Sequence, residues 1–211
     1  MLTRIDELTR DLYVFLGPDD ECYFLREYTS NRGYTYSATN SIISNIKKPV
    51  DRRGKPEWFF KERDIERVAR ELAASLNLPL LRPMTLVPAP PSACKSDPAH
   101  DDRLVQILSR VDHQRPLDIR ELVLQQETTS ADHVALTRRS LEELIENYRI
   151  DESAAAPPPT SIVVFDDVLT TGRHFVAMKR ILQARFGNVP VRGVFIARRI
   201  FAQDDENESL L

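Results

Sequence analysis

The chain has 211 residues, of which 42% are hydrophobic and 29% are charged, and this composition is typical of a globular protein with one elaborated domain or two small ones. A net charge of -3 and an isoelectric point near 5.9 exclude a uniformly basic protein, although not a local basic groove. No basic-then-apolar leader opens the chain and no uncharged run approaches about 18 residues, so we expect a cytoplasmic protein.

The two cysteines, Cys22 and Cys94, are too few for a structural zinc site and too far apart for a CxxC motif. We therefore interpret them as reduced thiols, which fits the expected compartment.

The first 58 residues are irregular, apart from a strand predicted at 22–29, where β-forming residues alternate. Beyond them, apolar residues at helical spacing predict four helices, and short apolar runs predict four strands. The helices are marked by residues 65–76, 104–111, 141–148 and 175–182, and the strands by 84–90, 119–124, 161–165 and 191–197. From Met84 onward strands and helices alternate, which predicts an α/β fold with right-handed βαβ units and a parallel sheet.

The stretch "IVVFDDVLTTGRHF", from Ile162 to Phe175, joins two kinds of chemistry. We expect Asp166 and Asp167 at the end of a strand, where ionised carboxylates only accept hydrogen bonds and so suit a vicinal diol. The turn at 170–172 leads into a helix, whose first amides favour an anion, and its glycine lets a phosphate approach the backbone. A ribose 5-phosphate carries a diol and a phosphate only a few ångströms apart.

This stretch is also compatible in part with three other interpretations. One acid at the end of an apolar strand can simply solvate that end, and this stays open for each aspartate taken alone. A Walker B element would need a GxxxxGK[ST] loop, which the chain lacks. A receiver-like phosphorylation site would place its acidic pair at the first strand rather than two-thirds along the chain.

The stretch closely resembles the phosphoribosyl pyrophosphate (PRPP) signature of type I phosphoribosyltransferases: about four apolar residues, two acids, two apolar residues and T-T-G. The resemblance implies that Asp166 and Asp167 bind the ribose 2- and 3-hydroxyls. It also implies that the 5-phosphate is wrapped by Val168, Leu169, Thr170, Thr171 and Gly172. Many members carry Thr or Ser two positions after the glycine, where this chain has His174. His174 could contact the phosphate or cap the helix, and both alternatives stay open.

The family also has a pyrophosphate loop after an earlier strand, and "LVPAPPSACKSDP" stands at that position. Ser92 offers a hydroxyl, and Lys95 offers a point charge suited to phosphate. The alternative is a surface loop with an incidental lysine. Arg103 could reach back toward the pyrophosphate. The alternative is that the preceding Asp101 and Asp102 instead hold Arg103 in place.

The polar segment "QQETTSADHVALTRR" resembles by position the mobile loop that closes over the substrate in this family. We expect Arg138 to act as a catalytic cation there, with His133 and Arg139 as further candidates. The alternative is that the histidine is merely solvated and that the two arginines begin the next helix on its exposed side.

The arrangement looks most like the group related to the competence protein ComF, over roughly residues 60 to 200. This implies a Rossmann-like phosphoribosyltransferase core at 59–200, an N-terminal hood at 1–58 and an acidic tail at 201–211. In type I enzymes a variable hood recognises the nitrogenous acceptor. The side chains in a position to do so are Arg26, Tyr28, Tyr34, Tyr36, Asn40 and Lys47.

The expected reaction transfers the phosphoribosyl group of PRPP to a small nitrogenous acceptor and releases pyrophosphate. Mg²⁺ is the implied cofactor, bound through PRPP near Asp166 and Asp167 rather than directly by the protein. The alternative is a non-catalytic regulatory module that binds PRPP or a nucleotide. We expect no membrane or nucleic-acid partner, and a homodimer is left open.

Overall fold

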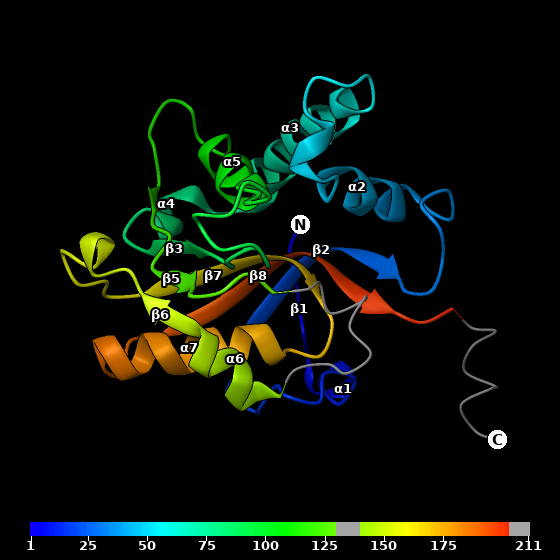
Figure 1. Cartoon of the computed structure of the whole chain (residues 1–211). Helices are drawn as coiled ribbons and strands as arrows, with labels where there is room; N and C mark the ends of the chain where they lie inside the picture. Colours follow the sequence, from blue (N-terminus) through cyan, green and yellow to red (C-terminus); the bar gives the residue numbers. More distant parts are fainter. Residues whose placement is uncertain (130–139, 203–211) are drawn as a thin grey trace.

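The computed structural model describes residues 1–129 and 140–202, and within them the main sheet has six strands in the order β1-β2-β8-β7-β3-β4 (Figure 1). Neighbouring strands are parallel, except that β1 runs antiparallel to β2. The protein is therefore α/β with a mostly parallel sheet, as predicted. The strands are β1 Thr3–Arg4, β2 Cys22–Thr29, β3 Thr85–Pro88, β4 Asp118–Ile119, β7 Ile162–Leu169 and β8 Val191–Ile200.

Helices cover both faces of this sheet (Figure 1). One face carries α2 (Ala38–Ile46), α3 (Trp58–Ser75) and α5 (Arg103–Ser109), and the other carries α6 (Leu141–Asn147) and α7 (Arg173–Phe186). Because both faces are covered, the central strand β7 begins with a continuous apolar run rather than an alternating one: residues 162–165 are all buried. The short helices are α1 Glu7–Arg10, α4 Leu78–Leu81, η1 Val50–Arg52 and η2 Glu152–Ala154. In the part of the chain that the structure describes, no helix has the length and apolarity needed to span a membrane.

The N-terminal segment contributes to the main sheet. β2 pairs in parallel with β8 from Cys22, opposite Gly193, to Thr29, opposite Ile200. Cys22 is fully buried within the same apolar core as the central strands. The strand predicted at 22–29 is confirmed, and it lengthens the parallel sheet beyond the strands predicted from residue 84 onward. The hood role of residues 1–58 stays a prediction.

One predicted strand was wrong, and one predicted helix, at 141–148, ends a residue earlier than expected. The strand predicted at 119–124 is broken by a turn, in which the Leu122 amide donates to the Arg120 carbonyl, 2.9 Å away. The chain then leaves the main sheet, and β5 (Val123–Gln125) pairs antiparallel with β6 (Tyr148–Ile150) in a separate two-stranded sheet. Tyr148 was assigned to a helix, but it begins β6 because its neighbours find backbone partners in β5.

The strand predicted at 161–165 is also longer than expected. β7 continues to Leu169 because β8 keeps pairing with it up to Leu169, opposite Arg198. Asp166 and Asp167 therefore lie inside the strand, in its carboxyl-terminal half, and not beyond its end.

Candidate functional site

The two aspartates face opposite sides of the sheet, because successive side chains of a strand alternate. Asp167 points toward α2 and α5, where it meets Lys47 and Arg103. Asp166 lies on the side of α7, where the charge of His174 acts on it. The side chains that the sequence predicted to bind one diol thus stand on either side of one strand.

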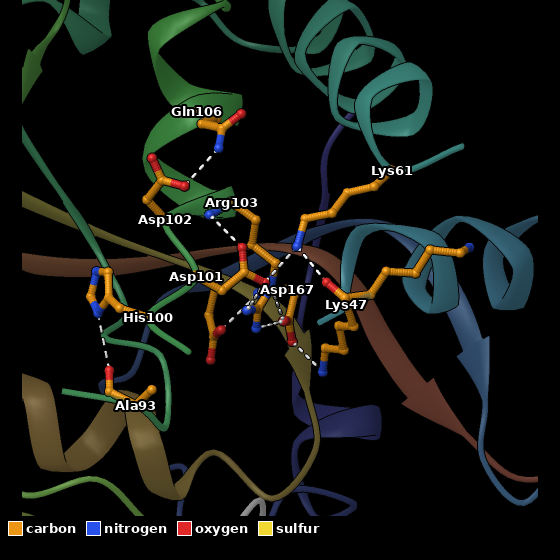
Figure 2. Close-up of polar contacts among 11 residues, drawn as sticks. Lys47, Lys61, Ala93, His100, Asp101, Asp102, Arg103, Gln106 and Asp167 are labelled. Carbon is orange, nitrogen blue, oxygen red and sulfur yellow. Dashed lines mark hydrogen bonds and ion pairs between the residues drawn. The ribbon is translucent and has the colours of Figure 1, made fainter. Parts of the chain in front are cut away.

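Asp167 is held by two cations (Figure 2). The Lys47 Nζ atom lies 2.8 Å from Oδ1 of Asp167, and the Arg103 Nη2 atom lies 2.7 Å from Oδ2. Burial alone would raise the pKa of Asp167, but the charges of Lys47 and Arg103 outweigh it and bring the pKa well below its usual value. Asp167 is therefore an ionised acceptor whose charge is balanced by two cations.

Asp166 has a different environment. Its Oδ1 accepts a hydrogen bond from the Asp167 amide, 2.7 Å away. Burial, followed by the neighbouring Asp167 carboxylate, raises the pKa of Asp166 to about 6. A strongly perturbed carboxyl near the carboxyl end of a parallel strand marks a candidate functional site.

The turn predicted to bind the phosphate joins β7 to α7. Thr170 is exposed and Thr171 half-buried, whereas Val168 and Leu169 are buried, so at those two positions only the backbone can face a ligand. Gly172 is the N-cap of α7 and has a φ of 83°, in the left-handed region that favours glycine. The amides at the start of this 14-residue helix are those that favour an anion.

The structure adds a neighbour to this turn that the sequence did not indicate. The Phe15 amide donates to the Thr171 carbonyl, 3.1 Å away. A Cβ atom placed on Gly172 would lie 2.7 Å from Cδ2 of Leu16. The glycine is therefore required by its backbone conformation and by the N-terminal segment packed against it, in addition to any bound phosphate.

His174 lies in the first turn of α7, two residues after the N-cap. Its Nδ1 atom shares a hydrogen bond with the Tyr148 hydroxyl, 2.8 Å away. This contact joins α7 to β6 and positions the imidazole near Asp166, whose pKa its charge lowers.

The predicted pyrophosphate loop follows β3 and is attached to the segment after β5. Thr128 Oγ1 donates to Asp97 Oδ2 at 2.6 Å, and the Ser92 carbonyl accepts from the Thr129 amide at 2.8 Å. Ser92 and Lys95 are both exposed, and Lys95 Nζ lies 3.1 Å from Glu121 Oε2. Lys95 thus pairs with the segment between β4 and β5, and the cations that contact Asp167 are Lys47 and Arg103.

Arg103 is the first residue of α5, and Asp101 holds its guanidinium at 3.1 Å. The predicted support by Asp101 is confirmed, whereas Asp102 accepts from the side chain of Gln106. Arg138, the expected catalytic cation, lies outside the described residues, as do His133 and Arg139.

Sequence reasoning did not predict the contact between Lys47 and Asp167, because it grouped Lys47 with the side chains of the acceptor hood. No local pattern around "SNIKKP" indicates a carboxylate partner on a strand far along the chain. Of the other hood candidates, Arg26 pairs with Glu71 at 2.5 Å, and buried Asn40 bonds the backbone of Thr29.

An open groove of about 530 Å³ lies away from these carboxylates, along β2 and the start of α2. It includes Arg26 but none of the residues predicted for the PRPP site. The β7–α7 junction is a better candidate site than this groove, because it combines carboxylates of perturbed pKa with the start of a helix. A groove by itself indicates neither a ligand nor a reaction.

A search of protein-family models and a search of curated proteins returned no match for this chain. Across residues 1–129 and 140–202, no three His, Cys, Asp or Glu side chains gather closely enough to hold a metal ion. Mg²⁺ commonly binds through one or two carboxylates together with substrate phosphates, and a magnesium ion that arrives with its ligand stays a prediction for this site.

Proposed function

We propose that the protein binds PRPP and transfers its phosphoribosyl group to a nitrogenous acceptor, on a Rossmann-like core of the type I phosphoribosyltransferase kind. The observation that carries this proposal is the junction of β7 and α7. Half-buried Asp166 and buried Asp167, with opposite pKa shifts, lie near the end of β7, and the turn that follows leads to a left-handed glycine at the start of α7. A ligand that matches both halves carries hydroxyl donors beside a phosphate.

The reaction breaks the bond between the anomeric carbon and the pyrophosphate oxygen, and the electron pair leaves with that oxygen. The lone pair of the acceptor nitrogen forms the new bond, and the nitrogen then loses a proton. Protein groups can orient the ribose and neutralise the leaving group. Asp166 and Asp167 would accept from the ribose hydroxyls, and Arg103 and Lys95 are the cations proposed for the pyrophosphate side. Mg²⁺, when bound with PRPP, would supply further positive charge near the aspartates.

The test compares PRPP binding by calorimetry in the wild-type chain and in Asp166→Asn. Loss of charge-assisted hydrogen bonds should weaken binding on the order of 10- to 100-fold. Asp51→Asn is the matched control, since Asp51 is exposed, lies in η1 rather than in β7, and has its Oδ1 atom 3.6 Å from Arg52 Nε. Unchanged affinity in Asp166→Asn would remove the diol assignment.

Catalysis is tested separately, as pyrophosphate release from PRPP in the presence of ammonia and a panel of nitrogenous bases. Release that depends on one acceptor would support the transferase. PRPP binding without release would favour the regulatory module.

A further inference from the structure

Lys61 is a fully buried lysine that the proposed chemistry does not use. Its Nζ atom lies 2.7 Å from Asp101 Oδ2 and 2.7 Å from the Lys48 carbonyl oxygen, and its ammonium also lies 5.0 Å from the centre of the Trp58 ring. A buried ammonium is costly unless it is paired and hydrogen-bonded, so these contacts hold their partners in place. Lys61 thereby ties the end of α2 to the segment that precedes α5.

The two segments joined by Lys61 deliver the two cations that contact Asp167 (Figure 2). Lys47 stands next to Lys48 at the end of α2, and Arg103 shares Asp101 with Lys61. The result is a continuous chain of charges from Lys61 through Asp101 and Arg103 to Asp167, which Lys47 completes. Alternating signs along this chain keep each buried charge compensated.

Lys47 and Arg103 differ in how firmly they are held. The Arg103 side chain is 16% exposed and lies between two carboxylates, Asp101 and Asp167. The Lys47 side chain is 41% exposed, and its ion pair is the one with Asp167. A lysine is a flexible point charge and an arginine a rigid fork, so Lys47 can leave Asp167 at a lower cost than Arg103 can.

We propose that Lys47 is an exchangeable ligand for the pyrophosphate group. It pairs with Asp167 in the free protein, and it moves to the anionic leaving group when ribose hydroxyls take its place on Asp167. This inference rests on the proposed function. It assigns a phosphate-binding role to Lys47, a residue of the N-terminal segment. It also gives a reason for the contacts by which buried Lys61 holds the end of α2 in place.

The exchange predicts that substitution of Lys47 affects the affinities for PRPP and for ribose 5-phosphate differently. Lys47→Ala should weaken PRPP binding about 10-fold or more, because a charge-assisted contact to pyrophosphate is lost. The same substitution should leave ribose 5-phosphate binding unchanged or tighter, because it removes the competitor for Asp167. Lys47→Arg, which keeps the charge, should retain most of the affinity for PRPP. All three chains are measured by calorimetry in the same buffer.

Arg185→Ala is the matched control, because Arg185 is 44% exposed and pairs with Glu152 near the far end of α7. It should change neither affinity. Equal losses of PRPP and ribose 5-phosphate in Lys47→Ala, or no loss of PRPP, would overturn the exchange while leaving the proposed function in place. A wild-type chain that does not bind PRPP would overturn both.

Discussion

Asp166 and Asp167 are adjacent in β7, yet the fold shifts their pKa values in opposite directions. Asp167 lies between Lys47 and Arg103, which stabilise its ionised form. Asp166 is half-buried beside another carboxylate, so its ionised form is disfavoured, and its pKa rises to about 6. Within residues 1–129 and 140–202 no cation forms an ion pair with Asp166, and a partly buried carboxylate in that situation costs stability, which a binding site accepts when the ligand supplies the missing donors.

This difference predicts the pH dependence of stability. Asp166 binds its proton more tightly in the folded chain than in the unfolded one, so its contribution to the free energy of unfolding falls as the pH rises from about 4 through about 6. Asp166→Asn removes this loss and keeps an oxygen that can accept from the Asp167 amide. The variant should therefore gain stability relative to the wild type between pH 5 and pH 8, by about 1 kcal/mol.

Urea unfolding of both chains at the two pH values measures this gain. The same variant should bind PRPP more weakly, so a rise in stability would accompany a loss of binding. If Asp166→Asn is destabilised by the same amount at pH 5 and pH 8, Asp166 is a structural acceptor, and its raised pKa does not contribute to the pH dependence of the free energy of unfolding.

At the scale of elements, the start of α7 depends on the loop that follows α1. The Phe15 amide and the Leu16 side chain both contact the turn that precedes α7. Asp20 joins this loop to itself and to α7, since it accepts from the Gly17 amide at 2.8 Å and from Lys179 Nζ at 2.6 Å. The N-terminal segment therefore forms one wall of the candidate phosphate turn.

Gly172→Ala should lower the free energy of unfolding by about 1–2 kcal/mol, because alanine is strained in the left-handed region. Gly54→Ala is the matched control: Gly54 has a φ of 82°, close to the 83° of Gly172, but no atom lies within 4 Å of its added Cβ. The loss at Gly172 should exceed the loss at Gly54, since only the first new methyl group meets Leu16. Chemical denaturation compares the two, and equal losses would show that the Leu16 contact carries no cost.

At the scale of the whole molecule, the first 58 residues and the rest share one hydrophobic core. Ile5, Cys22 and Phe24 belong to the same buried cluster as the apolar side chains of β7 and β8. β2 also satisfies the backbone groups along one edge of β8, at seven paired positions. A chain without this segment would expose the apolar surface of β8 and its unpaired edge.

Removal of residues 1–58 should therefore leave a chain that does not unfold cooperatively. A chain that ends at Ala202, the last buried residue of the described part, should keep the thermal transition of the full protein. Circular dichroism during heating distinguishes the two. A cooperative transition in the chain that begins at residue 59 would show that the core folds without β2, and the predicted boundary would then separate two independent units.

Local pattern was sufficient wherever neighbours in the sequence are also neighbours in the structure. The apolar runs at 162–165 and 191–197, the alternating run at 22–29 and the helical spacing from Ile65 to Leu72 all lie in the predicted element types. The carboxylate pair and the T-T-G turn could be recognised because their residues are contiguous. The PRPP assignment drawn from them stays a prediction.

Tertiary structure decided how those residues are used. β7 continues past Phe165, and the chain leaves the main sheet at Leu122, because of the distant strands that offer backbone partners. The sequence of one segment does not show which strand it will pair with. The same holds for charge: nothing in the sequence indicates the partners of Lys47 and Lys61, and only packing brings Lys47 and Arg103 to Asp167 and Lys61 to Asp101. Ion pairs depend on distance in space, so residues far apart along the chain show no spacing by which the pair could be predicted.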